Sequence, residues 1–435
     1  MKKSMKRGTA LAGAIAMILS GLAGCGSGKS VEKEAEQNAG FVPSLDTEKE
    51  VTLEIAGFMG NFEALDQVIN DFNVYYPNVT INYEQNELRG LADYLNNNEY
   101  VDIFMTSDAN VRNSDLEGAY VLDDCLDLFQ ENVDTGAIDP ELLGACTVDG
   151  KLVRIPLAKM MCGMVVNKTL LQNEGLEVPV TYEEFLSVCE TLKAKGYTPI
   201  QSARNHACSD LILPMAMSII GNDEALIEKA NAGDSSYADS LYPVYERLEE
   251  LIDKGYMSDE VNGTYPEDNY DGSILAFFEG DVPFWVANTE SVSGMKKRES
   301  RSEAYSANPF EYEFINVPLG DNGTYEYAEP WYGFSVNKNG TQIDYAVEFM
   351  NFLMTEEELN KLAEIKGMPS VTVHNNDERY MYALHEDKPE AGYVYDGRLN
   401  NSDITSAVAD AGNQMGAGGI NSAEEAIAAV KGRME

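Results

Sequence analysis

Apolar and polar positions along the chain repeat with two periods, one typical of strands and one of helices. Residues 51–56, 79–83 and 101–105 are apolar or alternate, and each segment predicts a strand. Between the first two strands, apolar side chains recur at helical spacing and predict a helix that Pro77 ends. These side chains are Phe62, Leu65, Ile69 and Phe72.

Three later segments begin with the pattern of a helix-capping box, in which Ser or Thr precedes Glu by three residues. The capping residues are Thr181, Thr355 and Ser422. Gly196 is expected to end the first of these helices. Strands that alternate with helices predict an α/β fold with mostly parallel sheets, and no repeat of solenoid length is visible.

The N-terminal residues resemble an export signal. A basic start is followed by a small and apolar run from Ala10 to Ala23, which is too short to favour a bilayer-spanning helix. The run ends in Leu-Ala-Gly-Cys at Cys25, which resembles the bacterial lipobox, where the Cys is lipidated. We expect residues 1–24 to be a lipoprotein signal peptide and residues 25–49 to be the lipidated Cys and a flexible tether. An uncleaved N-terminal anchor is the alternative.

Composition narrows the classes of partner. The 435 residues favour two or three domains, and 31 Lys and Arg stand against 73 Asp and Glu, a net charge of -42. Loss of the four basic residues of the signal would change it to -46. Such a chain repels nucleic acid and anionic lipid headgroups, so membrane attachment has to be covalent or hydrophobic. The acidity is expected to keep an exported domain soluble.

Reactive side chains are few. The chain has 3 His and 6 Cys, no Cys lies at zinc-ligand spacing, and buried free thiols are expected. Residues 23–30 fit a loose phosphate-loop pattern but lack the preceding strand and following helix, so nucleotide binding is not expected. No catalytic residue, metal or cofactor is predicted.

From residue 51 onward, several segments occur in a familiar order. Residues 72–81 read F-N-V-Y-Y-P-N-V-T-I, residues 150–157 read G-K-L-V-R-I-P-L, and residues 179–185 read P-V-T-Y-E-E-F. Residues 331–338 read W-Y-G-F-S-V-N-K. Together they resemble the sugar-binding extracellular solute-binding proteins (family 1, maltose-binding-protein-like) of ATP-binding-cassette (ABC) importers.

The resemblance implies an α/β, two-lobe periplasmic-binding-protein-like fold with hinge crossovers and an interlobe ligand cleft. The N-terminal lobe is expected at residues 50–160 plus 334–379, and the C-terminal lobe at 161–333 plus 380–435. Crossovers are expected near Lys159–Gly163, near Trp331–Phe334 and near Tyr380. Ligand contacts would come from loops beyond the carboxyl ends of strands.

Sugar recognition calls for aromatic faces and planar polar groups, and the resemblance suggests where they lie. The chain has 24 Tyr, 15 Phe and 2 Trp. Trp331 is a candidate for stacking on a sugar beside Tyr332, with core packing near a hinge as the alternative. Trp285 lies on an apolar strand, where core packing is at least as well supported.

Other candidates lie on predicted loops. Phe58, Asn61 and Phe62 flank the first strand–helix loop, although Phe62 also begins the apolar face of the helix. Asp108 follows the third strand, where capping of the loop is the alternative. Asn205 and His206 lie in a polar loop, where a solvated His is the alternative.

Two positions depart from the family pattern. Asn288-Thr289-Glu290 replaces a frequent Gly-x-Trp, so Glu290 would bind hydroxyls or a cationic ligand. Lys159-Met160 stands where some members have Glu on the first crossover. Both changes argue against a maltose-like ligand.

The sequence therefore predicts a monomeric, lipid-anchored substrate-binding protein on the extracytoplasmic face of the cell membrane. It would capture an oligosaccharide or other sugar and deliver it to the permease subunits of an ABC transporter. The alternatives are a secreted glycoside hydrolase, which needs two suitably spaced carboxylates, and a structural lipoprotein of the cell surface.

Overall fold

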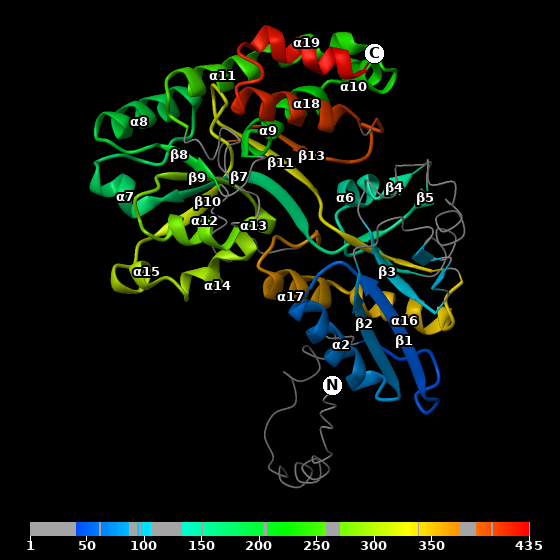
Figure 1. Ribbon diagram of the computed structural model, residues 1–435. Coiled ribbons are helices and arrows are strands. Elements are labelled where there is room, and N and C mark those ends of the chain that lie inside the picture. The colour runs from blue at the N-terminus through cyan, green and yellow to red at the C-terminus, as the bar shows by residue number, and fades with distance from the viewer. Residues whose placement is uncertain are drawn as a thin grey trace, which may run out of the picture. The chain divides into compact units, whose positions relative to one another are not determined.

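The computed structural model describes residues 41–60, 62–86, 94–95, 97–98, 100–106, 133–148, 151–202, 207–257, 270–337, 339–373, 389–401 and 403–434. The signal peptide, Cys25 and the phosphate-loop look-alike lie outside these residues. The described chain contains two large sheets with helices packed against them (Figure 1). Over the described residues, no helix combines the length and apolarity that a membrane crossing needs.

The first sheet has the strand order β2-β1-β3-β12-β6. Its strands are β1 (Val51–Gly57), β2 (Val79–Gln85), β3 (Ile103–Thr106), β6 (Ile155–Pro156) and β12 (Gly333–Val336). β1 runs parallel to β2 and β3, whereas β12 runs antiparallel to β3 and β6. The three strands predicted from the pattern at the start of the domain are confirmed.

Three helices pack with this sheet: α2 (Glu63–Tyr75), α16 (Ile343–Leu353) and α17 (Glu356–Lys366) (Figure 1). The predicted apolar face of α2 buries Leu65 and Phe72, and the Phe72 ring lies edge-on to Phe349 at 5.2 Å between centroids. Burial of this face, rather than helix propensity, stabilises α2.

The segment before β1 is held against α2 and α16. Backbone N–H and Oγ of Ser44 each donate to a carboxylate oxygen of Glu348, both at 2.8 Å. The Tyr76 hydroxyl donates to the same carboxylate at 2.5 Å. The side-chain amide of Asn78 donates to the carbonyls of Asp46 and Lys49, at 3.1 and 2.6 Å. Within the predicted tether, residues 44–49 thus contact the folded domain.

The second sheet has the order β13-β11-β7-β9-β8, and β10 also pairs with β7. Its strands are β7 (Lys159–Asn167), β8 (Ile200–Ser202), β9 (Phe284–Asn288), β10 (Tyr312–Ile315), β11 (Thr324–Pro330) and β13 (Pro389–Val394). β7 pairs antiparallel with β9, β10 and β11, whereas β8 with β9 and β11 with β13 are parallel. Both sheets are therefore mixed, and the expectation of mostly parallel sheets is wrong.

Helices cover both faces of the second sheet (Figure 1). On one face lie α7 (Lys168–Asn173), α8 (Tyr182–Ala194), α9 (Ala207–Gly221), α10 (Glu224–Asn231), η1 (Ser235–Leu241), α11 (Tyr242–Asp253), α18 (Asp403–Gly416) and α19 (Ala423–Met434). On the other lie α12 (Tyr270–Phe277), α13 (Thr289–Ser293), α14 (Met295–Glu299) and α15 (Glu303–Ala307). The remaining elements are α6 (Pro140–Ala145), β4 (Thr147–Val148) and β5 (Lys151–Leu152).

The strands supply both cores by alternation. In β9, Phe284 and Val286 pack into the core under α8 and α9, whereas Trp285 and Ala287 pack into the core under α12 and α14. Successive side chains of a strand point to opposite faces, so an apolar run buried on both faces is expected here.

The capping patterns are confirmed in part. Thr181 and Glu184 form the reciprocal capping box at the start of α8, and Gly196 follows its end with φ +97°. At α17 the hydroxyl of Thr355 caps Glu358 N–H, but the Glu358 carboxylate binds Lys361 instead of returning to the cap. An ion pair has therefore replaced half of that motif.

Cysteines follow the expectation for the described residues. Cys146, Cys162, Cys189 and Cys208 are buried, and none of these four forms a disulfide. Burial raises the pKa of the Cys208 thiol to about 12, so this thiol stays protonated at neutral pH.

Candidate functional site

Two adjacent connections join the two sheets. β6 continues into β7 through Leu157 and Ala158, and β11 continues into β12 through Trp331 and Tyr332. The connections are hydrogen-bonded to each other: Trp331 N–H donates to the Ala158 carbonyl at 2.8 Å, and Leu157 N–H donates to the Tyr332 carbonyl at 3.1 Å. They lie at or next to two of the predicted crossovers, whereas Tyr380 is outside the described residues.

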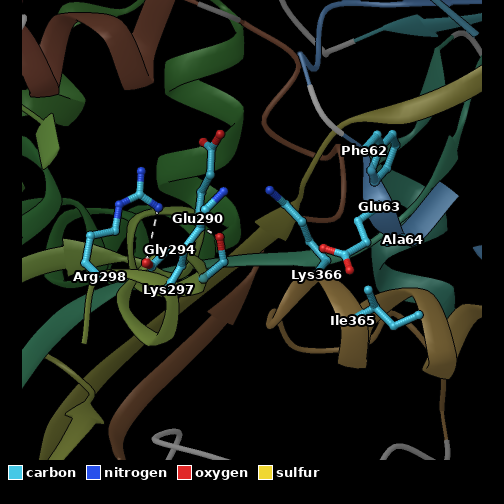
Figure 2. A pocket seen from close by; sticks show the side chains of 10 residues that line it. Phe62, Glu63, Ala64, Glu290, Gly294, Lys297, Arg298, Ile365 and Lys366 are labelled. Atoms are coloured by element: carbon cyan, nitrogen blue, oxygen red, sulfur yellow. Dashed lines mark hydrogen bonds between the residues drawn. The ribbon is translucent and has the colours of Figure 1, made fainter. Parts of the chain in front are cut away.

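A pocket of about 310 Å³ lies near these connections, with two walls (Figure 2). One wall comes from the start of α2 and the end of α17, and the other from α13 and α14. The lining residues are Phe62, Glu63, Ala64, Glu290, Ser293, Gly294, Lys297, Arg298, Ile365 and Lys366. The volume is at the lower end of the range for small-molecule pockets.

The two walls meet at Gly367, which ends α17 in the left-handed conformation with φ +73°. A Cβ at this position would lie 3.6 Å from the Cα and the carbonyl oxygen of Ser293. Glycine adopts this conformation without the strain that other residues incur, so it sets the end of α17 beside α13.

Aromatic side chains lie on and beside the connections. Tyr332 and Phe58 are partly exposed and pack edge-on at 4.3 Å between centroids. Trp331 is 2% exposed, and Phe62 is edge-on to it at 6.3 Å. The Lys366 ammonium lies 4.9 Å from the centroid of the Trp331 ring. Tyr332 and Phe58 are therefore more accessible to a ligand than Trp331 is.

Charged groups of both signs line the pocket. Arg298 donates to Asp271 from Nε and Nη2, at 3.0 and 2.6 Å, so its charge is neutralised locally. Glu290 is partly buried and Lys297 is exposed. Burial lowers the pKa of Lys366 below its usual value, while the carboxylate of Glu290 acts in the opposite direction.

Trp285 occupies a different place from the other candidates. It is 2% exposed in the core under α12 and α14, with its ring 6.1 Å from that of Phe277, and it does not line the pocket. The core-packing alternative describes this position, because strand alternation directs Trp285 to a face that helices cover.

The remaining predicted site residues either lie at or near the pocket or fall outside the described residues. Phe62 and Glu290 line the pocket. Trp331 and Tyr332 form one of the neighbouring connections, and Phe58, which follows β1, packs against Tyr332. The other candidates, Asn61, Asp108, Asn205 and His206, lie outside the described residues.

Two further groups of polar side chains were not predicted. Lys297 and Lys366 line the pocket, yet neither is part of a motif. Near the start of β7, the Cys162 thiol lies 3.9 Å from a carboxylate oxygen of Asp210, and the Tyr327 hydroxyl donates to Glu329 at 2.8 Å. Burial, followed by the charges of Asp210 and Glu329, raises the pKa of Cys162 well above its usual value.

These arrangements suit recognition of a polar ligand. Carboxylates accept from hydroxyls, ammonium groups donate to oxygen, and aromatic rings cover C–H surfaces. Among the described residues, no group of three or more His, Cys, Asp or Glu side chains is placed to hold a metal ion.

Solved structures share this fold. The sugar-binding protein MalE from Xanthomonas citri matches with a TM-score of 0.66 and 14% identity, over 88% of this chain and 96% of that one. A sugar transporter protein from Bacillus licheniformis in complex with stachyose matches with a TM-score of 0.62 and 17% identity, over 88% and 100%. An ABC-transporter binding protein from Bifidobacterium animalis in complex with mannobiose gives 0.63 and 16%, over 91% and 98%. The predicted α/β two-lobe periplasmic-binding fold is confirmed.

Sequence comparison leads to the same group. The chain is 21% identical over 229 residues to the multiple sugar-binding protein of Streptococcus mutans, a match that covers 51% of this chain. It spans about half, 52%, of the length of that curated relative. The family model for bacterial extracellular solute-binding proteins matches residues 57–359, which is more than half of the chain. The chain therefore belongs to the family of bacterial extracellular solute-binding proteins.

Proposed function

We propose that this protein is the substrate-binding lipoprotein of an ABC importer and captures an oligosaccharide or other sugar between its two lobes. The main observation is the pocket beside the paired connections, where Glu290 lines the wall and the partly exposed rings of Phe58 and Tyr332 lie nearby. An aromatic face and a carboxylate are the two kinds of group that a sugar ring binds.

The comparisons support a sugar as the ligand class. Relatives of this fold are named as complexes with mannobiose, stachyose and raffinose. In our proposal, Phe58, Tyr332 and Glu290 contact the ligand directly, and Trp331 supports them from behind. Asn61, Asp108, Asn205 and His206 stay predicted contacts from neighbouring loops.

The lobes and the location complete the proposal. The N-terminal lobe comprises residues 50–160 plus 334–379, and the C-terminal lobe comprises residues 161–333 plus 380–435. A lipid on Cys25 holds the protein at the extracytoplasmic face of the membrane, where a monomer delivers the sugar to the permease subunits. Lobe closure follows from a ligand that binds both lobes, since such a ligand stabilises the closed state.

A thermal-shift screen of the purified protein tests the proposal. The panel contains mannobiose, raffinose, stachyose, maltose and the corresponding monosaccharides. A ligand that binds only the folded state raises the melting temperature by mass action, by more at higher concentration. A panel that leaves the melting temperature unchanged throughout would contradict sugar binding.

The same incubation separates a binder from a hydrolase. We expect every saccharide to be recovered intact by chromatography, because the protein is proposed to be a binding protein without catalytic activity. Release of shorter sugars in proportion to protein concentration would instead favour the glycoside hydrolase. Metabolic labelling with an alkyne fatty acid tests the anchor, since Cys25→Ser should abolish incorporation.

A further inference from the structure

In the pocket wall formed by α2 and α17, Lys366 contributes an ammonium group that forms no ion pair with any described carboxylate. Lys366 extends into the space between the two walls (Figure 2) and is partly buried. Its ammonium lies over the Trp331 ring at 4.9 Å. Among the described residues, no carboxylate forms an ion pair with it and no carbonyl accepts from it. Burial of an ammonium group costs free energy unless an opposite charge or a hydrogen-bond acceptor compensates for the lost hydration.

Another lysine of the same helix shows the usual arrangement. Lys361 donates to Asp71 and to Glu358, each at 2.8 Å, and so is neutralised by two carboxylates. A lysine in the last turn often binds the terminal carbonyls of its helix, but Lys366 extends over the indole instead. Binding of the terminal carbonyls of α17 therefore does not explain the position of the Lys366 ammonium group.

Neighbouring groups on this wall also donate. The first turn of α2 has no side-chain cap, because Phe62 stands at the N-cap position. Unpaired N–H groups and the positive end of the helix dipole favour negative charge there. The buried indole N–H of Trp331 has no acceptor among the described residues. The start of α2 thus offers N–H donors to an oxygen-rich group, whereas the indole N–H is buried behind the pocket lining.

Two carboxylates, those of Glu63 and Glu290, line the same pocket and could neutralise the Lys366 charge. Glu63 is exposed at the start of α2, where solvent screens its charge. Glu290 belongs to the opposite wall, and neither carboxylate forms an ion pair with Lys366 or Lys297. Glu290 raises the pKa of Lys366 and burial lowers it, with burial the larger cause. Glu290 therefore compensates for only part of the buried charge.

We propose that Lys366 binds the carboxylate of an acidic sugar unit, a uronic acid, while Glu290 accepts hydrogen bonds from hydroxyls of the same ligand. This inference rests on the proposed function and specifies its ligand class. A charge-assisted hydrogen bond in a partly desolvated site is stronger than a neutral one, so the acidic sugar is preferred over its neutral counterpart. Lys297, exposed at the opposite wall, contributes a weaker and more strongly screened attraction.

Calorimetry with matched ligands tests the proposal. Digalacturonate and trigalacturonate are compared with galactobiose and galactotriose, and 6-O-sulfated galactobiose is a third arm. We expect the uronates to bind about tenfold more tightly than the neutral sugars, and added NaCl to reduce this difference. The variant Lys366→Gln should remove most of the preference for uronates over neutral sugars. Lys229→Gln, an exposed lysine on α10 away from the pocket, is the matched control and should retain the preference.

Each contrary result has a distinct meaning. Equal affinity for uronates and neutral sugars overturns the inference but leaves the proposed function intact. An equal loss of affinity for both ligand types in Lys366→Gln assigns Lys366 a structural role and also overturns it. If the sulfated sugar binds tightly and the uronates do not, the proposed recognition of a carboxylate is wrong. If neither these ligands nor the panel above binds, both proposals fail.

Discussion

The two tryptophans have equal exposure and very different surroundings. Trp285 and Trp331 are each 2% exposed. Trp285 lies among the rings of Phe277 and other aromatic side chains between β9 and α12. Trp331 lies at the connection between the sheets, beneath an ammonium group and beside the partly exposed Tyr332. Burial alone therefore does not separate the two tryptophans, whereas the charge of a neighbouring side chain does.

Truncation of the core tryptophan should have the largest effect. Trp285→Ala removes an indole from a packed cluster, and we expect a loss of about 3–5 kcal/mol in the free energy of unfolding. Sugar affinity of the folded fraction should change little. Denaturant unfolding followed by calorimetry at low temperature measures the two quantities. A variant that is as stable as the parent would refute the core assignment, and Trp285→Phe, which retains a ring, should lose less.

Truncation of the second tryptophan should affect binding as well. Trp331→Ala removes the surface on which Lys366 lies, and we expect sugar affinity to fall by about 1–3 kcal/mol. Trp331→Phe is the control that keeps an aromatic face without the indole N–H. If the folded Ala variant binds sugar as tightly as the parent does, Trp331 has no part in the site. The two tryptophans would then differ in their location and not in their contribution to binding.

A smaller effect should come from the residue that ends α17. Gly367→Ala places a Cβ at φ +73°, which should cost about 1 kcal/mol of stability through backbone strain. Gly432→Ala is the matched control, since Gly432 lies in α19 with no heavy atom near the added Cβ. That substitution should stabilise the protein by about 0.5–1 kcal/mol through helix propensity. Equal stability of the two variants would show that the end of α17 can rearrange freely.

Two tyrosines, one beside Phe62 and one in the aromatic core, should make the free energy of unfolding depend on pH above pH 10. No effect of these tyrosines is expected at pH 7. Burial raises the pKa of Tyr83, beside Phe62, to about 12. Burial and a hydrogen bond to Glu299 raise the pKa of Tyr312 further, in the aromatic core. Both tyrosines are neutral in the folded state above pH 10, where the unfolded chain ionises, so their stabilisation is complete below pH 10 and declines as the pH rises.

Absorbance of phenolate at 295 nm and melting temperatures between pH 8 and 12 test this prediction. Tyr312→Phe and Tyr83→Phe should each lose less stability above pH 10 than the parent protein does. A parent protein whose melting temperature is constant to pH 12 would contradict the raised pKa values.

Local patterns predicted much of the fold. Strands β1 and β2 follow from their own alternation, and α8 from a capping box whose bonds join residues three apart. The apolar run around Trp285 also predicted a strand, but alternation alone does not reveal whether helices cover its face. That depends on α12 and α14, which bring Phe277 and Met295 to it.

The site was less predictable because its parts come from distant segments. Lys366 reaches Trp331 only when the end of α17 meets the connection after β11, and no motif marks either lysine of the pocket. Glu290 was identified through a departure from the family pattern, and it lines the pocket. The Glu358 carboxylate shows why even a clear local motif can be only half formed: Lys361, held also by Asp71 of α2, competes for it.

The attachment of Ser44 to Glu348 and Tyr76 has a mechanical consequence. Tension along a membrane-attached N-terminus would enter the protein at α16 and the end of α2, before it reaches β1. The load would then be shared by two packed helices instead of falling directly on β1, which lies between β2 and β3. Glu348→Ala should therefore lower the force at which β1 is pulled from the first sheet.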